Sequence, residues 1–281
     1  MLLLLRKKIA NAVAGYDADA QDYFNRAEAL GGSFDLSAIN ATYTESYVKT
    51  AISEMVAGLK TDGVWDDITE MYLLSGVTFD GITAKLKYDT VATLTNNNFV
   101  SGDLLAAGSG AGLQGDGSTK CFDTGMPQNR IAASDSHLST YNTAFTTGIV
   151  YMGSETVNNN NRLALFSETS SGLTYGDSDS PKDVTVAVAN ALAYLIGTKS
   201  GDNELFRNGT SVGNSAISTT NRNPTAISIY LFAMNRAVTP FYYANFRSSL
   251  MTAGSGLTDT QAANLSTRVN TLMASLGANV Y

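Results

Sequence analysis

The spacing of apolar residues changes once along this chain, close to Val77, and that change limits what the chain can fold into. Before Val77, apolar residues recur every three or four positions, as on one face of a helix. After it, short runs of β-branched and aromatic residues are separated by Gly, Asn, Asp and Ser, which is typical of strands joined by turns. The sequence therefore predicts helices first and an all-β region afterwards.

Three helices are predicted before the change of period. They cover residues 17–32, 42–63 and 64–76. The second helix begins with Thr42 and Glu45 in the spacing of a capping box, in which each side chain bonds to the other residue's backbone. These helices are expected to dock on a larger unit.

At least eight strands are predicted after the change of period. Asn208 and Gly209 lie between two extended arms, which indicates a two-residue hairpin. A closing helix is predicted after the last strand, where Thr258 can cap against Gln261. The predicted strands lie in residues 92–102, 120–125, 144–154, 161–168, 183–190, 192–200, 203–215 and 226–235.

This order of elements defines the expected fold class. Strands without helices between them favour an antiparallel sandwich over an alternating α/β fold. We expect an α+β chain in two parts. Residues 1–76 form an N-terminal arm and helices that serve in docking, and residues 77–281 form an antiparallel β-sandwich with a C-terminal helix.

Charge and cysteine content restrict the class of function. The net charge is −7 and only 15% of residues are charged, which argues against nucleic acid as a partner. The single cysteine, Cys121, excludes an internal disulfide and, beside Phe122, is expected to be a small buried hydrophobe. The opening "MLLLLRKK" has its apolar run before the basic residues, the reverse of a secretory signal. We therefore expect no signal peptide and no membrane insertion.

The first residues form an apolar arm that belongs neither to the strand pattern nor to a signal. Its leucines and isoleucine are interleaved with three basic residues. Exposed, they would favour aggregation. We expect them to dock either on a neighbouring chain or on this chain's own core, and the sequence leaves both open. The docking residues are Leu2, Leu3, Leu4, Leu5 and Ile9.

The stretch "GLQGDGSTKCFDTG", residues 112–125, is similar to a phosphate-binding loop in composition only. Such a loop has its lysine directly after the last glycine and opens a helix. Here two hydroxyl residues precede Lys120, and extended residues follow it. Asp116 has no acidic neighbour before Asp123, which argues against a calcium loop of the EF-hand kind. The stretch is predicted to be a Gly-Asp-Gly turn between strands.

No catalytic constellation stands out. Glycoside hydrolases need two facing carboxylates, and the nearest candidates are Asp177 with Asp179 and Asp202 with Glu204. Both pairs lie in turn-rich segments, which favours solvated loops. The single histidine, His137, has no nucleophile near it in sequence, so we expect a surface or strand-end histidine. The chain is therefore predicted not to be an enzyme.

Calcium is the metal that the sequence leaves open. Asp177, Asp179 and Asp183 fall within seven residues, and carboxylate oxygens are the ligands that calcium prefers. With one histidine and one cysteine, a zinc site is not expected. No other cofactor is predicted.

Carbohydrate is the other ligand that the sequence leaves open. Sugar rings stack on aromatic faces, and their hydroxyls bond to amides and acids. The candidates for facing a sugar are Tyr151, Tyr175 and Asn159, the last in a run of four asparagines. Tyrosines on strands more often pack against neighbours than bind ligands. Further tyrosines that could contribute are Tyr194, Tyr230, Tyr242 and Tyr243.

Several patches of the sequence occur in an order that carries a resemblance. They are "AISEMVAGLKTDGVWDDITEMYLLSG", "NFVSGDLLAAGSGAGLQGDGSTKCFDTG", "ASDSHLSTYNT", "ELFRNGTSVG", "FAMNRAV" and "GLTDTQAANLSTRVNTLMASLG". From residue 42 to the C-terminus the chain resembles a family of bacteriophage structural proteins. In that family a few helices precede a concanavalin A-like, LamG-type jelly-roll sandwich. The resemblance implies that the Gly-Asp-Gly turn and the Asn-Gly hairpin are structural.

The same resemblance implies a role in the virion. We expect a non-enzymatic component, present in several copies, either a capsid decoration protein or a tail fibre or adaptor. It would be anchored through its N-terminal region, with other virion proteins and copies of itself as partners, after assembly in the bacterial cytoplasm. The alternative is a receptor-binding module of a phage tail that binds a host surface glycan, and a glycoside hydrolase is less favoured.

Overall fold

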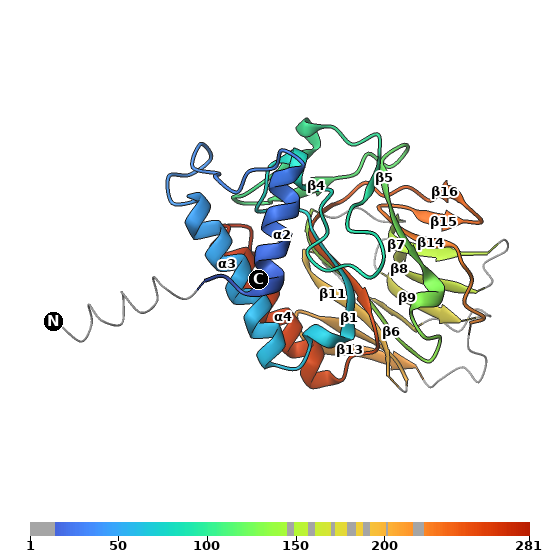
Figure 1. Cartoon of the computed structure of the whole chain (residues 1–281). Helices are drawn as coiled ribbons and strands as arrows, with labels where there is room; N and C mark the ends of the chain where they lie inside the picture. The colour runs from blue at the N-terminus through green and yellow to red at the C-terminus, as the bar shows by residue number, and fades with distance from the viewer. Residues whose placement is uncertain are drawn as a thin grey trace.

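The chain forms three layers in the computed structural model (Figure 1). The structure describes residues 15–144, 149–156, 161–169, 172–178, 184–187, 192–200, 202–215 and 222–281. Within these residues an outer layer of helices covers an eight-stranded sheet, and a nine-stranded sheet packs on the other side of that sheet. This arrangement confirms the predicted β-sandwich with helices from both ends of the chain.

Among the described residues, three helices make the outer layer, and their ends follow from local capping. The first, α2 (Ala18–Ala29), begins after Asp17, whose carboxylate accepts the Asp19 N–H. The last, α4 (Asp259–Ser275), begins at the predicted capping box of Thr258 and Gln261. Both predictions are confirmed.

The second helix, α3 (Glu45–Thr61), is confirmed, but its predicted cap is wrong. The capping residue is Thr44, whose hydroxyl accepts the Tyr47 N–H. Because Glu45 is the first helical residue, it cannot reach back in the way that a capping-box acid does from the third position. Thr42 lies in the turn before the helix.

The prediction of a third helix over residues 64–76 is wrong. A short 3-10 turn, η1 (Trp65–Asp67), leads into a strand, β1 (Ile68–Leu73), which pairs with β17 (Arg247–Gly254). Five of its six residues are buried, so the strand shows no alternation of apolar and polar positions. This strand lies before the boundary predicted at residue 76, and the sandwich therefore takes one strand from the first part of the chain.

The eight-stranded sheet is the middle layer. Its strands run in the order β13-β12-β11-β6-β17-β4-β3, and β1 also pairs with β17. The predicted Asn208-Gly209 hairpin is confirmed between β12 and β13, with φ of 54° and 79° at the two turn residues. The strands not yet bounded are β3 (Leu104–Leu105), β4 (Gly112–Gln114), β6 (Asp135–Ala144), β11 (Ala193–Ser200), β12 (Asn203–Arg207) and β13 (Thr210–Ser215).

The nine-stranded sheet is the outer layer opposite the helices. Its main order is β10-β9-β8-β7-β14-β5-β2, and β15 pairs in parallel with β7 and carries β16. The strands are β2 (Thr95–Asn97), β5 (Cys121–Pro127), β7 (Ile149–Glu155), β8 (Arg162–Thr169), β9 (Gly172–Ser178), β10 (Val184–Ala187), β14 (Ser228–Leu231), β15 (Met234–Arg236) and β16 (Thr239–Phe241).

One continuous apolar core joins the helices to both sheets. It runs from Phe24 of α2 through Leu138 of β6 to Leu165 of β8. An ion pair is enclosed with it: the Lys85 ammonium lies 2.8 and 2.9 Å from the two Glu70 oxygens, and both side chains are fully buried. The helices are therefore part of the same packed unit as the sandwich.

The Gly-Asp-Gly turn connects the two sheets at a corner, between β4 and β5. The Asp116 carboxylate accepts the backbone N–H groups of Ser118, Thr119 and Lys120 at 2.9, 2.8 and 3.1 Å. Partial burial opposes ionisation, but the Thr119 hydroxyl, which also donates to the carboxylate, and these backbone bonds hold the pKa of Asp116 well below its usual range. Gly117 has a φ of +76°, and the predicted turn is confirmed.

Replacing Gly117 with valine should destabilise this corner. At a φ of +76° a β-branched side chain is strained, and its Cβ would lie 3.1 Å from the Asn245 Cβ. We expect a loss of about 1–3 kcal/mol in the free energy of unfolding, measured by chemical denaturation. Gly102→Val is the control, because a Cβ there meets nothing within 4 Å and φ is not left-handed. Equal stability of the two variants would contradict the role of Gly117.

Candidate functional site

The two tyrosines predicted to face a sugar lie between the sheets, so that prediction is wrong. Tyr151 is 1% exposed, and its ring packs edge-on against Phe246 at 4.8 Å. Tyr175 is fully buried, and its hydroxyl lies 2.6 Å from the Ser136 Oγ of the other sheet. The alternation of side chains along β7 and β9 points both rings into the core. The third candidate, Asn159, lies outside the described residues.

The predicted calcium ligands are not brought together by any described contact. Asp177 lies on β9, and only its backbone is described, while Asp179 and Asp183 lie outside the described residues. Among the side chains that the structure describes, no group of three His, Cys, Asp or Glu residues could hold a metal ion. The calcium site stays a prediction. The same holds for the docking residues of the arm, because the description begins at residue 15.

His137 is fully buried as the third residue of β6, so the structure excludes the surface position and leaves the other expectation, a histidine near a strand end. Its Nδ1 lies 2.5 Å from the Ser255 carbonyl oxygen, and its Nε2 lies 3.0 Å from the Thr252 Oγ1. This geometry fits a neutral ring that donates from Nδ1 and accepts at Nε2. Burial lowers the pKa of His137 to about 4, although the Ser255 bond opposes this shift. Both ring nitrogens have hydrogen-bond partners, so His137 has a structural role in the sheet.

Cys121 on β5 is buried, as expected. Burial raises the pKa of its thiol to about 11, which disfavours the reactive thiolate. Its sulfur lies 3.6 Å from the Asn97 amide nitrogen. The expectation of a small buried hydrophobe is confirmed.

The acidic pair Asp202 and Glu204 lines an open pocket of about 380 Å³ near the start of α4. Asp202 is exposed, whereas Glu204 lies on β12 and its carboxylate accepts a hydrogen bond from the Ser211 hydroxyl. The loop expectation is therefore wrong for Glu204. The remaining lining residues are Thr198, Ser200, Leu257, Thr258, Asp259 and Thr260.

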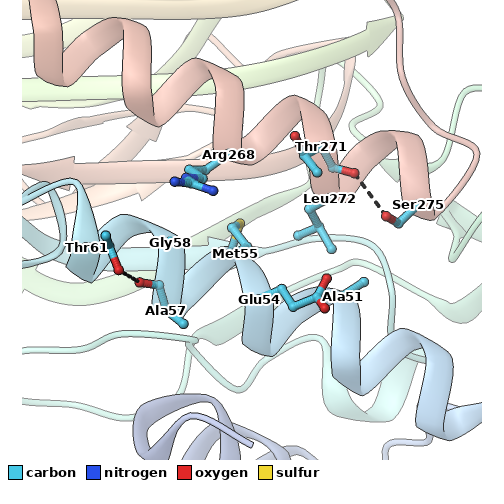
Figure 2. A pocket seen from close by; sticks show the side chains of 10 residues that line it. All are labelled: Ala51, Glu54, Met55, Ala57, Gly58, Thr61, Arg268, Thr271, Leu272 and Ser275. Atoms are coloured by element: carbon cyan, nitrogen blue, oxygen red, sulfur yellow. Dashed lines mark hydrogen bonds between the residues drawn. The ribbon is translucent and has the colours of Figure 1, made fainter. Parts of the chain in front are cut away.

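A second hollow of about 400 Å³ lies between α3 and α4 on the outer helical layer (Figure 2). Met55 and Leu272 form its apolar floor, and Arg268 crosses it at one end. The lining is completed by Ala51, Glu54, Ala57, Gly58, Thr61, Thr271 and Ser275. We call this hollow the α3–α4 groove.

Among the described residues, a pair of exposed aromatic side chains lies at the β15–β16 hairpin, beside β7. Phe241 and Tyr242 are 42% and 53% exposed, and their ring centroids are 4.5 Å apart at an angle of 79°. The Arg236 guanidinium lies over both rings, 4.4 Å from the Phe241 centroid and 5.2 Å from that of Tyr242. The Arg236 Nε donates to Glu155, whose Oε1 is 2.5 Å away. We call these four residues the hairpin aromatic site.

A small apolar cluster lies beside this site, on the outer face of the nine-stranded sheet. Val150, Ala164, Phe166 and Met234 are buried and separate from the main core. Arg162 on β8 lies over the Phe166 ring at 4.7 Å. Arginine stems and aromatic rings therefore cover this outer face, which gives it apolar contact area with donor groups above it.

The backbone of the hairpin is strained at several positions. Among the described residues, seven other than glycine have a positive φ, and three of them are asparagines. The other four all lie in residues 232–242: Phe232 at 65°, Ala237 at 48°, Val238 at 69° and Tyr242 at 51°. Left-handed backbone is costly for such residues, above all for the β-branched Val238, and is concentrated at functional sites in proteins.

Of the four residues in the hairpin aromatic site, only Tyr242 was among the tyrosines considered from the sequence. Glu155, Arg236 and Phe241 were missed. Tyr242 has a left-handed φ of 51°, and the turn at Ala237 and Val238 contains neither glycine nor asparagine. The usual hairpin signal is therefore missing from the sequence.

No family model and no curated protein sequence matches this chain. Among solved structures, the carbohydrate-binding module CBM40 of the Ruminococcus gnavus IT-sialidase is similar over 56% of this chain and 98% of its own. The identity there is 14% and the TM-score 0.43. Domain 4 of AbnA, a GH43 extracellular arabinanase from Geobacillus stearothermophilus, is similar over 71% of this chain and 98% of its own, at 13% identity and a TM-score of 0.43.

The NanB sialidase from Streptococcus pneumoniae is similar over 53% of this chain, at 15% identity and a TM-score of 0.41. The match covers only 26% of the sialidase chain. At these TM-scores none of the three establishes a shared fold, and the sandwich rests on the strand pairing described above. No described helix has the length and apolar character needed to cross a membrane.

The buried His137 should make folding stability depend on pH. Its pKa is about 4 in the folded chain against 6.5 for a free histidine, so the unfolded chain binds the proton first as pH falls. Its contribution is complete above about pH 7 and is lost toward pH 4. Between about pH 7.5 and about pH 5 we expect roughly 2 kcal/mol of unfolding free energy to be lost through this group.

Denaturation of the wild type and of His137→Asn at several pH values would measure this effect. The variant lacks the titrating ring, so its stability should fall less over the same interval. Parallel pH profiles for the two proteins would show that His137 does not cause the loss.

Proposed function

We propose that this chain is a non-enzymatic carbohydrate-binding protein whose ligand lies on the hairpin aromatic site. The observation that carries the proposal is the pair of exposed rings, Phe241 and Tyr242, with Arg236 held over them by Glu155. Large aromatic side chains are ordinarily buried when they have only a packing role. Two adjacent exposed rings beside a fixed arginine form a surface suited to a ligand.

The chemistry of the site suits a sugar ring. The C–H face of a sugar packs on an aromatic face, and its hydroxyls need donors and acceptors at fixed positions. Arg236 is 25% exposed, and its Nε bonds to Glu155. The arginine is restrained before any ligand arrives, so less side-chain entropy is lost on binding.

The same geometry argues against hydrolysis at this site. Glu155 is 1% exposed and engaged by Arg236. A glycosidase needs two carboxyl groups that reach opposite sides of the scissile bond. Glu155 cannot contact a sugar ring from its buried position, so its role is to orient Arg236.

Tyr242→Ala should weaken carbohydrate binding. Removing one stacking ring costs about 1–1.5 kcal/mol, which is roughly a tenfold increase in Kd. A glycan array with the wild type would identify the sugar, and titration calorimetry would then compare Tyr242→Ala with Tyr47→Ala. Tyr47 is a suitable control because it is 39% exposed on α3, in the opposite layer. An array without any bound glycan, or equal affinities for the two variants, would refute the proposal.

We further propose that the chain is a bacteriophage virion component. This second proposal rests on the ordered sequence patches from residue 42 onward, which resemble phage structural proteins. The component would be either a capsid decoration protein or a tail fibre or adaptor. A glycan-binding surface suits a part of the virion that contacts the host cell. Copies of the chain and other virion proteins would be its partners.

Purified phage particles provide the test of the virion proposal. We expect the chain to be detected in them by mass spectrometry at a fixed ratio to the major capsid protein. Particles washed in high salt are the control, because an adsorbed contaminant would be lost. Its absence from particles made in cells that express the chain would contradict the proposal.

A further inference from the structure

A row of polar side chains crosses the outer face of the nine-stranded sheet next to the hairpin aromatic site. Thr95 of β2, Asp123 of β5 and Tyr230 of β14 are directly paired across three neighbouring strands. Directly paired residues share one face of a sheet, with Cβ atoms about 4.5–5.5 Å apart. Phe122 and Thr124, on either side of Asp123, are fully buried. Because side chains alternate along a strand, the row therefore points away from the core.

Tyr243 connects this row to the hairpin aromatic site. It follows Tyr242 directly in the chain. Tyr243 packs against a small cluster of Cys121, Tyr230 and Ala233, which is separate from the main core. One end of this cluster therefore touches the row and the other continues into the exposed rings. We call Thr95, Asp123, Tyr230 and Tyr243 the β5–β14 patch.

The strand pairing also places the patch beside the exposed rings. Gly153 of β7 pairs with Tyr230 of β14 and with Met234 of β15. Met234 in turn pairs with Phe241 of β16. Neighbouring strands lie about 4.8 Å apart, so Phe241 is about two strand spacings from Gly153 and Tyr230 about one. A chain of linked sugar rings can span this interval.

The polar groups of the patch lack partners within the protein. Tyr230 is only 8% exposed, yet no described residue forms a hydrogen bond with its hydroxyl or with that of Tyr243. The Asp123 Oδ1 accepts the Gly125 N–H at 2.8 Å, and in the described part of the chain its second oxygen has no partner. Such groups on a largely buried surface need hydrogen bonds from water or from a ligand.

The protonation of the patch determines which groups donate and which accept. Burial, followed by the nearby Asp123 carboxylate, raises the pKa of Tyr230 to about 12. Burial also raises the pKa of Tyr243. Both tyrosines therefore keep their protons and can donate, whereas a carboxylate only accepts. Asp123 forms no ion pair with a described residue, so its charge disfavours a second negative group close by.

We propose that the ligand of the hairpin aromatic site is an oligosaccharide of at least two units, whose second unit is uncharged and binds the β5–β14 patch. The first ring stacks on Phe241 and Tyr242. The second donates hydroxyls to Asp123 and accepts hydrogen bonds from Tyr230 and Tyr243. Each sugar hydroxyl can donate and accept, which matches this mixture of groups. This inference rests on carbohydrate binding at the hairpin aromatic site and adds the class of ligand.

Titration calorimetry with neutral saccharides of one, two and three units tests the proposal. The probes are built from glucose, galactose or N-acetylglucosamine, together with any neutral sugar that the glycan array identifies. We expect the two-unit ligand to bind the wild type about tenfold more tightly than its one-unit counterpart, because it makes additional hydrogen bonds.

Two conservative variants locate the second unit. Tyr230→Phe removes only a hydroxyl, and Asp123→Asn removes the charge but keeps an acceptor for the Gly125 N–H. Each should weaken binding of the two-unit ligand about three- to tenfold and leave one-unit binding unchanged. Tyr47→Phe in the helical layer is the control and should match the wild type. Melting temperatures equal to that of the wild type would verify that both variants fold.

The outcomes separate this inference from carbohydrate binding itself. Suppose that Tyr242→Ala weakens binding, but one- and two-unit ligands bind equally or both patch variants match the wild type. Carbohydrate binding would then stand, and the extended site would be overturned. Tighter binding of a ligand with an acidic second unit would overturn it as well. If no saccharide binds the wild type, both proposals are wrong.

Discussion

The structure depends on a sheet that must be buried on both faces. The eight-stranded sheet lies between the helices and the second sheet, and its central strand β17 carries Ser248, Ser249 and Thr252, all fully buried. Buried hydroxyls are tolerated only when bonded. Here the Thr252 Oγ1 lies 2.5 Å from the Ser139 Oγ and 3.0 Å from the His137 Nε2, and Ser139 is 2.8 Å from the Tyr194 hydroxyl. This chain of hydrogen bonds ties three neighbouring strands together in one register, and both outer layers pack on the result.

Features set by local chemistry could be predicted from the sequence. The cap of α4, the Asn208-Gly209 hairpin and the turn at Asp116 each depend on a few adjacent residues, and all three are as expected. Features set by burial on both faces could not. In β1 and β17 the apolar and small polar residues lack a period of two, because neither face meets water. The pattern of β1 therefore predicts a helix, and the pattern of β17 predicts no strand. The burial of His137 could not be predicted either, because its partners are Thr252 of β17 and Ser255 just after that strand, more than a hundred residues away.

The candidate site shows a different limit of sequence reasoning. Tyr151, Tyr175 and Tyr242 have the same side chain, and only the fold decides which of them is buried and which is exposed. The first two face the other sheet, while Tyr242 leaves β16 with a left-handed backbone and points outward. Arg236 and Glu155 are 81 positions apart and meet because β15 pairs in parallel with β7. Such a pair leaves no local signal in the sequence. Arginine is also polar, so its presence in a sequence does not indicate that its guanidinium stacks on aromatic rings.

The layer order places the two candidate surfaces on opposite outer sides of the molecule. The α3–α4 groove and the entry of the arm lie on the helical side, and the hairpin aromatic site lies on the far face of the opposite sheet (Figure 1). Because one core runs through all three layers, the two sides belong to one packed unit. If the chain is held in a particle by its helical side, the same geometry turns the exposed rings away from the particle. Attachment and recognition would then be separated by the full thickness of the sandwich, which is the arrangement that a binding module on a large assembly requires.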